Sequence, residues 1–301
     1  MIGEAAAVAT SCLWTLSSIF FTSAGRKIGP LSLNAYRSLM AVGFLLATHF
    51  LFIESFLPVA TNTQWFWMGL SGIVGLGIGD SGLFAAYILM GPRRTLLVMA
   101  LSPIFAVVCA YLMLGEILPS LAMIGIAITL GGVMLVILEG EKRSGELPLS
   151  RKLKTYGVSF ALIGAAGQGI GLVLAKVGIY SNPAMALNPL SATLMRMILG
   201  AFSVWIVMLL GGRMVELRKA LSNRKGMGLT VVAAIAGPFL GVTFSMVAVT
   251  YAQAGVAQTL MSLGPVIIIP LVWVLYHQRT SWQGTIGALI GVIGVSILFL
   301  V

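Results

Sequence analysis

Long hydrophobic runs separated by short polar stretches make up most of the sequence. Runs such as 95–114 and 256–275 hold the roughly 20 residues that an α-helix needs to cross about 30 Å of hydrocarbon. Inside a bilayer, backbone groups must form their hydrogen bonds within a helix or a closed barrel. The alternation of apolar and polar residues that is typical of barrel strands is absent. The pattern therefore predicts a bundle of transmembrane helices.

The polar stretches divide the chain into ten predicted helices. Their approximate spans are residues 3–24, 31–53, 65–89, 95–114, 120–138, 155–178, 187–210, 227–251, 255–276 and 282–301. The predicted fold is an all-α integral membrane protein. Residues 141–154 are predicted to link a first five-helix repeat, residues 1–140, to a second one, residues 155–301.

An offset of 162 positions aligns the second half of the chain with the first. Identical residues then coincide at several places: Met99 with Met261, Pro103 with Pro265, Gly75 with Gly237, and Gly79 with Gly241. Each half holds an odd number of predicted helices, so the second half must be inserted upside down relative to the first. The pattern therefore predicts two inverted repeats, an arrangement common in secondary transporters.

Charge along the chain favours this inversion and indicates an orientation. Almost all basic residues lie in the first, third, fifth, seventh and ninth connections between the predicted helices: Arg26, Lys27, Arg93, Arg94, Lys142, Arg143, Arg151, Lys152, Lys154, Arg213, Arg218, Lys219, Arg224, Lys225 and Arg279. Lys176 belongs near the opposite face. Because Lys and Arg collect on the cytoplasmic side, these odd connections are predicted to be cytoplasmic. The prediction is a multi-pass protein of the cytoplasmic (inner) membrane with both termini outside the cytoplasm.

Composition excludes other classes of protein. The 301 residues are 59% hydrophobic and 9% charged, whereas soluble domains are about 25% charged. The net charge of +10 is spread over short connections and forms no single patch, so nucleic acid is not a predicted partner. Cys12 and Cys109 lie inside apolar runs and indicate neither a disulfide framework nor a metal site. No catalytic or nucleotide-binding motif with its expected context occurs, so neither a cofactor nor enzyme activity is predicted.

The order of several short motifs resembles a known family. They are Trp14, the arginines Arg37 and Arg196 early in the predicted helices 31–53 and 187–210, Ser-Pro and Gly-Pro at Pro103 and Pro265, and Gly115-Glu116 before a glycine-rich helix. Together they resemble the EamA branch of the drug/metabolite transporter superfamily over essentially the whole chain. The resemblance implies an exporter of amino acids, related metabolites or drugs. Many relatives are basic between the second and third helices, which implies cytoplasmic termini, but this chain has no Lys or Arg there.

The resemblance also implies a central cavity. Its walls would come mainly from the predicted helices 3–24, 65–89, 95–114, 155–178, 227–251 and 255–276. Candidate substrate-binding residues in these helices carry a polar edge or precede a proline: Trp14, Met99, Gln168, Gln258 and Met261. Packing or a hydrogen bond between helices explains each of them as well.

Asp80 is the only carboxylate in the middle of a predicted span. An ionisable group there is unfavourable unless it is paired, hydrated or neutralised, so Asp80 is a functional candidate. Desolvation favours the neutral acid and would suit proton coupling, whereas Arg37 or Arg196 nearby would favour the carboxylate and a structural ion pair. The sequence leaves both alternatives open. Helical spacing places Asp80, Phe84 and Tyr87 on one face, which suits a substrate site for zwitterionic or cationic solutes.

Four residues are predicted to be structural: Arg37, Arg196, Pro103 and Pro265. The arginines lie near helix ends, where long side chains snorkel to the interface or bind loop carbonyls. Each proline removes a backbone donor and leaves the carbonyl four residues earlier without its helical partner. Broken helices at matching places also point to substrate sites in transporters, so the prolines have two explanations.

The leading hypothesis is a secondary-active exporter of small metabolites, amino acids or related solutes, which works by alternating access around the central cavity. Its partners would be the substrate, the lipid bilayer and, through Asp80, protons. One alternative is an uncoupled facilitator. Another is an exchanger of sugar phosphates or nucleotide sugars, although only Arg37, Arg196 and Lys176 are available to bind such anions. A non-transporting membrane protein is the remaining alternative.

Overall fold

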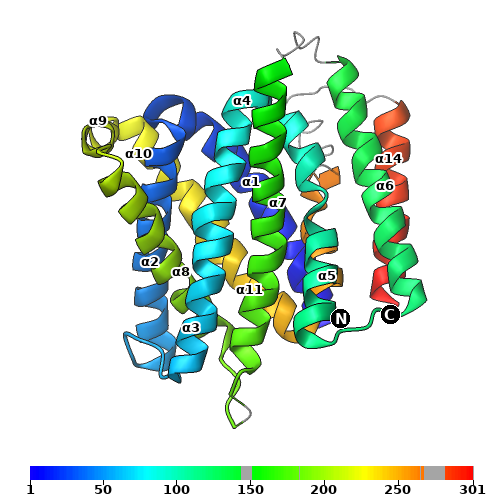
Figure 1. Ribbon diagram of the computed structural model, residues 1–301, viewed down its shortest axis with the longest axis horizontal. Coiled ribbons are helices and arrows are strands. Elements are labelled where there is room, and N and C mark those ends of the chain that lie inside the picture. Colours follow the sequence, from blue (N-terminus) through cyan, green and yellow to red (C-terminus); the bar gives the residue numbers. More distant parts are fainter. Residues whose placement is uncertain (144–150, 183, 265, 268–281, 301) are drawn as a thin grey trace.

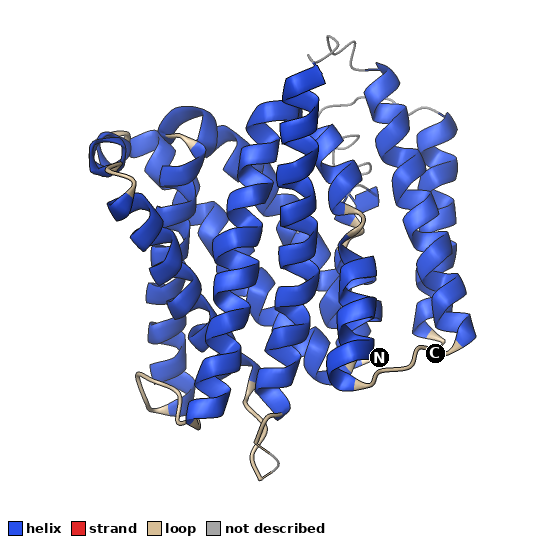
Figure 2. Cartoon of the chain, in the orientation of Figure 1, coloured by secondary structure: helices blue, strands red, loops and turns tan. Residues whose placement is uncertain are grey.

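The computed structural model describes residues 1–143, 151–182, 184–264, 266–267 and 282–300. Every regular element in these ranges is a helix (Figure 2). Most helices run side by side along a common direction, with α7 near the middle of the view (Figure 1). The start of α1 and the end of α14 lie at the same end of this bundle.

Each half of the chain contributes a series of helices. The first half forms α1 (Ile2–Ile28), α2 (Pro30–Ile53), α3 (Asn62–Ser71), η1 (Gly72–Gly79), α4 (Asp80–Met99), α5 (Ser102–Leu114) and α6 (Ser120–Arg143). The second half forms α7 (Arg151–Tyr180), α8 (Pro189–Leu210), α9 (Met214–Ser222), α10 (Arg224–Ala234), η2 (Ile235–Gly241), α11 (Val242–Tyr251), α12 (Ala254–Met261) and α14 (Trp282–Phe299).

Seven described helical segments are long and apolar enough to cross a membrane: Ile2–Ile28, Pro30–Ile53, Asn62–Ala86, Thr155–Tyr180, Pro189–Leu210, Arg224–Tyr251 and Trp282–Phe299. Ser102–Leu114 and Ser120–Leu135 are apolar but shorter. The predicted span 255–276 lies partly outside the described residues. The all-helical membrane architecture is confirmed, whereas ten crossings and the inversion stay predictions.

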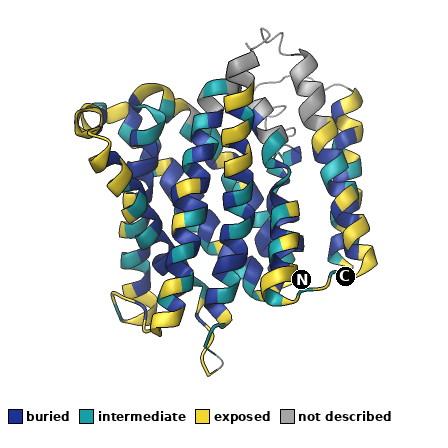
Figure 3. Cartoon of the chain, in the orientation of Figure 1, coloured by how far each residue is buried: buried dark blue, intermediate teal, exposed yellow. Residues whose placement is uncertain are grey.

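The outer surface of the bundle is apolar. Exposed residues lie along the outward sides of the helices and buried ones face inward (Figure 3). Phe52 on α2, Leu112 on α5 and Leu210 on α8 are each more than 70% exposed. Apolar surface of this extent is unfavourable in water and suits contact with lipid.

Local signals explain several helix ends. Thr61 and Gln64 form a capping box at the start of α3, in which Thr61 Oγ1 accepts from the Gln64 amide and Gln64 Oε1 accepts from the Thr61 amide. Asn188 Oδ1 accepts from the Leu190 amide, 2.9 Å away, at the start of α8. Gly29 links α1 to α2 with φ near +80°, a value that favours glycine, and Pro30 follows at the first turn of α2.

Two π-helical segments interrupt the long helices. η1 joins α3 to α4 and ends immediately before Asp80, and η2 joins α10 to α11. The glycines of η1 let α7 approach closely, because a Cβ added at Gly79 would lie 3.2 Å from the Cα of Gly167. A Cβ added at Gly75 would lie 3.6 Å from the Cα of Gly171. The two glycines therefore make close helix contacts of the kind that small residues permit in membranes.

The chain leaves the helical conformation next to Pro103. α4 ends at Met99, and α5 begins at Ser102 with Pro103 in its first turn. This confirms a break at that proline, which suits a first turn because its φ is helical and no donor is needed there. α12 ends at Met261, and Pro265 lies outside the described residues.

Two predicted connections contain helix. The backbone of residues 90–94 is helical, and α4 continues to Met99. Pro92 therefore lies inside α4, and a polar stretch that contains a proline need not be a loop, because proline can kink a helix without ending it. The predicted connection 211–226 contains α9, whose nine residues are too few for a clear helical period in the sequence.

Candidate functional site

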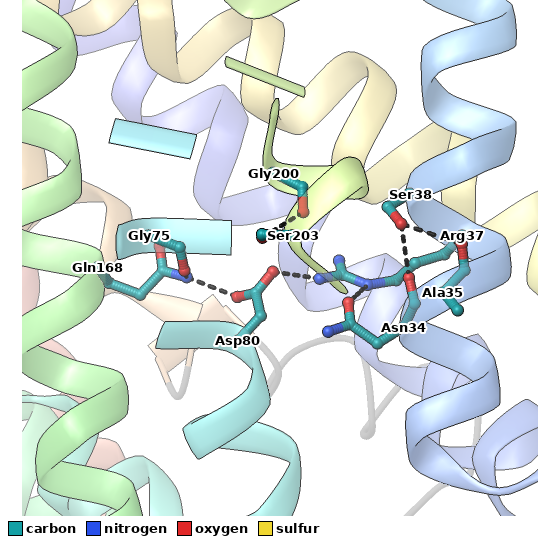
Figure 4. Close-up of polar contacts among 9 residues, drawn as sticks. All are labelled: Asn34, Ala35, Arg37, Ser38, Gly75, Asp80, Gln168, Gly200 and Ser203. Atoms are coloured by element: carbon teal, nitrogen blue, oxygen red, sulfur yellow. Dashed lines mark hydrogen bonds and ion pairs between the residues drawn. The ribbon is translucent and has the colours of Figure 1, made fainter. Parts of the chain in front are cut away.

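Asp80 lies where three helices meet. It begins α4 directly after η1, and only 5% of its surface is exposed. Its Oδ2 pairs with Nη2 of Arg37 on α2. Its Oδ1 accepts a hydrogen bond of 2.6 Å from Nε2 of Gln168 on α7 (Figure 4). Both carboxylate oxygens therefore have partners from other helices, and the buried negative charge is compensated.

Arg37 is held on several sides. Its Nε donates to Oδ1 of Asn34, one turn earlier on α2, over 2.9 Å. Its guanidinium carbon lies 5.3 Å from the ring centre of Phe21 and 5.0 Å from that of Phe84. Cations are attracted to aromatic faces at such distances. The predicted snorkelling of Arg37 is wrong, because an internal carboxylate and two rings hold the side chain with only 8% of the residue exposed.

Arg196 on α8 lies near the same carboxylate without pairing to it. Only 3% of the residue is exposed, so its predicted snorkelling is also wrong. Its Nε is buried and has no hydrogen-bond partner in the part of the chain that the structure describes. Its side chain packs against η1, since a Cβ added at Gly75 would lie 2.6 Å from its Nη2. Asp80 is close enough to attract it electrostatically. Among the described residues, Asp80 thus pairs with one of two nearby buried arginines.

The structure brings together three of the predicted substrate-binding residues. Gln168 contacts Asp80, and Phe84 covers the guanidinium of the arginine that pairs with Asp80. Trp14 instead packs against η2, because a Cβ added at Gly241 would lie 2.5 Å from its Nε1. Tyr87 belongs to α4, but its side chain lies outside the described part of the structure.

The remaining predicted contacts lie around the ends of α4, α5 and α12. Nε2 of Gln258 donates to Oγ of Ser102 over 2.8 Å, which ties α12 to the start of α5. Met261 is 3% exposed and belongs to the main hydrophobic core. Met99 packs on α7, where a Cβ added at Gly164 would lie 3.0 Å from its sulfur. The described residues show no contact between this group and Asp80, so the predicted residues divide into separate clusters.

Sequence reasoning missed a second ion pair, which is partly buried. Nζ of Lys176 on α7 lies 2.6 Å from Oε1 of Glu116, which follows α5. Lys176 also donates to the carbonyl of Ala252, and Oε2 of Glu116 accepts from the Ala254 amide over 2.9 Å. The pair therefore joins α5, α7 and the connection between α11 and α12. The signal in the sequence was Lys176 itself, the one basic residue that the sequence places near this face.

A cavity of about 310 Å³ lies between the α1–α2 turn, α4 and the start of α9. It is lined by Gly29, Pro30, Leu31, Phe84, Ala85, Arg213 and Glu216. Phe84 lines this cavity and also contacts Arg37, so the ring separates the cavity from the ion pair. Within the described residues, no cluster of three or more His, Cys, Asp or Glu side chains is suited to a metal ion.

Comparison with known proteins shows what the chain is similar to. A solved structure described as "Crystal structure of protein" has a TM-score of 0.72 and 17% sequence identity, and the alignment covers 99% of this chain and 96% of that chain. At this identity the likeness shows a shared fold alone. None of the curated proteins matches the chain. The sequence profile of the EamA-like transporter family matches residues 1–138 and 155–300. Because this match covers nearly the whole chain, the protein belongs to the EamA-like transporter family.

Proposed function

We propose that this protein is a secondary-active exporter of small metabolites, amino acids or related solutes, which works by alternating access. Its family supports the transport of a small solute across a membrane. The proposal of secondary-active transport rests on one observation, the buried ion pair of Asp80 and Arg37 at the junction of η1 and α4. Ionisable groups inside membrane helices mark substrate or ion pathways, and π-helical segments are frequent at functional sites.

Alternating access rests on two inverted halves, residues 1–140 and 155–301, linked by 141–154 and crossing the membrane ten times. Several observations support this division. η1 and η2 occupy corresponding places in the two halves, and α7 packs on η1 as α1 packs on η2. α4 and α12 end at the corresponding residues Met99 and Met261. Rocking of one half against the other would expose the centre to each side in turn.

The proposed coupling acts through the charge of Asp80. While the carboxylate is ionised, it holds α4 to α2 through Arg37. A proton bound to Oδ2 would remove the negative charge and weaken this attraction, so that α4 and α2 become free to separate. Arg196 on the other side offers the ionised carboxylate a second partner after movement. Opening at the opposite end of the bundle would require separation of Lys176 from Glu116.

Transport measurements in proteoliposomes test this function. We expect at least one labelled amino acid of a full panel to be transported, and an imposed pH gradient to accelerate it. If the solute equilibrates at a rate that does not depend on the pH gradient, the protein is a facilitator. Transport of sugar phosphates or nucleotide sugars that requires a counter-substrate would indicate an exchanger. Folded protein that transports none of these solutes would contradict the proposal, with protein-free liposomes as the control.

Orientation is part of the same proposal and has its own test. The odd-numbered connections between the predicted helices, which carry most of the Lys and Arg, are proposed to be cytoplasmic. Both termini then lie outside the cytoplasm. A reporter that fluoresces only in the cytoplasm, fused after Val301, is expected to stay dark. The same reporter inserted between residues 144 and 150 is expected to fluoresce. Bright fluorescence from the first fusion and darkness from the second would reverse the orientation and leave the transport proposal standing.

A further inference from the structure

α9 lies across the bundle instead of along it. In Figure 1 it is seen nearly end-on at the periphery, whereas α4 and α7 are seen from the side. Leu217 and Ala220 on its inner face are each 2% exposed and pack against the core formed by α1, α2 and α8. The hydroxyl of Tyr36 on α2 donates to the Leu217 carbonyl over 3.0 Å. α9 is therefore a fixed part of the fold.

The outer side of α9 combines basic and apolar residues. Arg218 and Lys219 are exposed and have no ion pair within the described part of the chain. Met214, Val215 and Leu221 are 38%, 63% and 55% exposed. The segment 213–225 carries several basic residues and a single acidic one: Arg213, Arg218, Lys219, Arg224 and Lys225 against Glu216. Glu216 is matched by Arg213 at 3.9 Å, and no described acidic residue forms an ion pair with the other basic residues of this segment.

Position and chemistry together indicate what covers this side. The long helices have apolar flanks that suit hydrocarbon, so a helix lying across their ends is at the depth of the lipid headgroups. The exposed apolar residues suit the boundary of the acyl chains. The unpaired Lys and Arg beside them suit the phosphates of an anionic leaflet. A soluble acidic partner would not need the apolar residues.

We propose that α9 binds anionic phospholipid headgroups, with Arg218 and Lys219 at the phosphates and Leu221 and Val215 at the acyl boundary. Bound lipid would hold α9 against α2 and the α1–α2 turn, because Leu217 and its hydrogen bond to Tyr36 connect them. Tyr36 directly precedes Arg37, so the lipid would stabilise the segment that carries the ion pair with Asp80. The inference concerns binding and does not depend on the proposed transport function.

The test titrates phosphatidylglycerol or phosphatidylcholine into the purified full chain in mild detergent. Thermal midpoints report stabilisation, and native mass spectrometry counts bound lipid. We expect phosphatidylglycerol to bind and to raise the midpoint more than phosphatidylcholine does. The double variant Arg218→Gln/Lys219→Gln should weaken phosphatidylglycerol binding by roughly tenfold or more. Leu221→Ser should weaken phosphatidylglycerol binding less, since the loss of one apolar contact reduces the affinity less than the loss of two charges does.

The matched control is Arg26→Gln/Lys27→Gln, which removes the same charge from exposed residues at the end of α1 on the same face. It should retain the response to phosphatidylglycerol. Equal loss in both double variants would show a general charge effect and overturn the proposal. So would equal stabilisation by soluble glycerol phosphate or by a polyglutamate peptide, or unchanged binding by the α9 variants. An unchanged midpoint in phosphatidylcholine verifies that each variant is folded.

Discussion

Asp80→Asn is expected to abolish gradient-driven transport and to lower the stability of the folded protein. The substitution leaves Arg37 buried without its counter-charge. Removal of one partner of a buried ion pair destabilises soluble proteins by about 3–5 kcal/mol. Thermal unfolding in detergent measures the stability, and uptake with and without a pH gradient measures the transport. Asparagine also resembles the neutral acid, so the folded fraction is expected to retain substrate exchange that no longer depends on pH.

A double variant separates coupling from structure. Arg37→Gln/Asp80→Asn removes both charges and should recover much of the lost stability, because no unpaired charge of the pair remains. If Asp80 carries the proton, the double variant stays uncoupled. If the pair is only structural, the double variant regains gradient-driven transport. A folded Asp80→Asn protein with an unchanged rate and unchanged pH dependence would contradict both roles.

Gly167→Ala is expected to be strongly destabilising, although it adds a single methyl group. The new Cβ would lie 2.6 Å from the Cα of Gly79 and 2.8 Å from the carbonyl oxygen of Val74. These are backbone atoms of η1, so they cannot relieve the clash by a rotamer change as a flexible side chain could. α7 would have to move away from η1, and Gln168, the next residue, would lose its position on Asp80. Overpacking of this kind costs about 1–3 kcal/mol or more.

Gly43→Ala is the matched control, since Gly43 is a helical residue of α2 and a Cβ there has nothing within 4 Å. It should be neutral or stabilising, because alanine favours the helix by roughly 0.5–1 kcal/mol over glycine. Thermal midpoints and uptake rates of the two variants give the comparison. Equal midpoints would show that α7 and η1 are not tightly packed in the membrane.

The hydrophobic pattern was sufficient to predict an all-helical membrane protein, and the order of several short motifs indicated its family. A membrane helix must satisfy its backbone within its own segment, so hydropathy along a short stretch determines whether it spans. Asp80 was recognisable for the same reason, because a carboxylate in the middle of an apolar run is unfavourable wherever its helix lies. The proline next to the end of α4 also marked a local break that depends on backbone chemistry alone.

Pairings between helices were decided by tertiary structure. Helical spacing gave no means of choosing between Arg37 and Arg196 as the partner of Asp80, since the choice depends on how α2, α4 and α8 rotate and pack. The same packing placed Gln168 on Asp80, separated Trp14 from it, and joined Lys176 to Glu116 across the sequence. Close glycine contacts between η1 and α7 bring Gln168 near Asp80. The sequence by itself therefore determined which segments are apolar enough to span a membrane and that Asp80 is costly within such a segment. Only the tertiary structure decided the partners of Asp80, because a buried charge is compensated by groups that are distant in sequence.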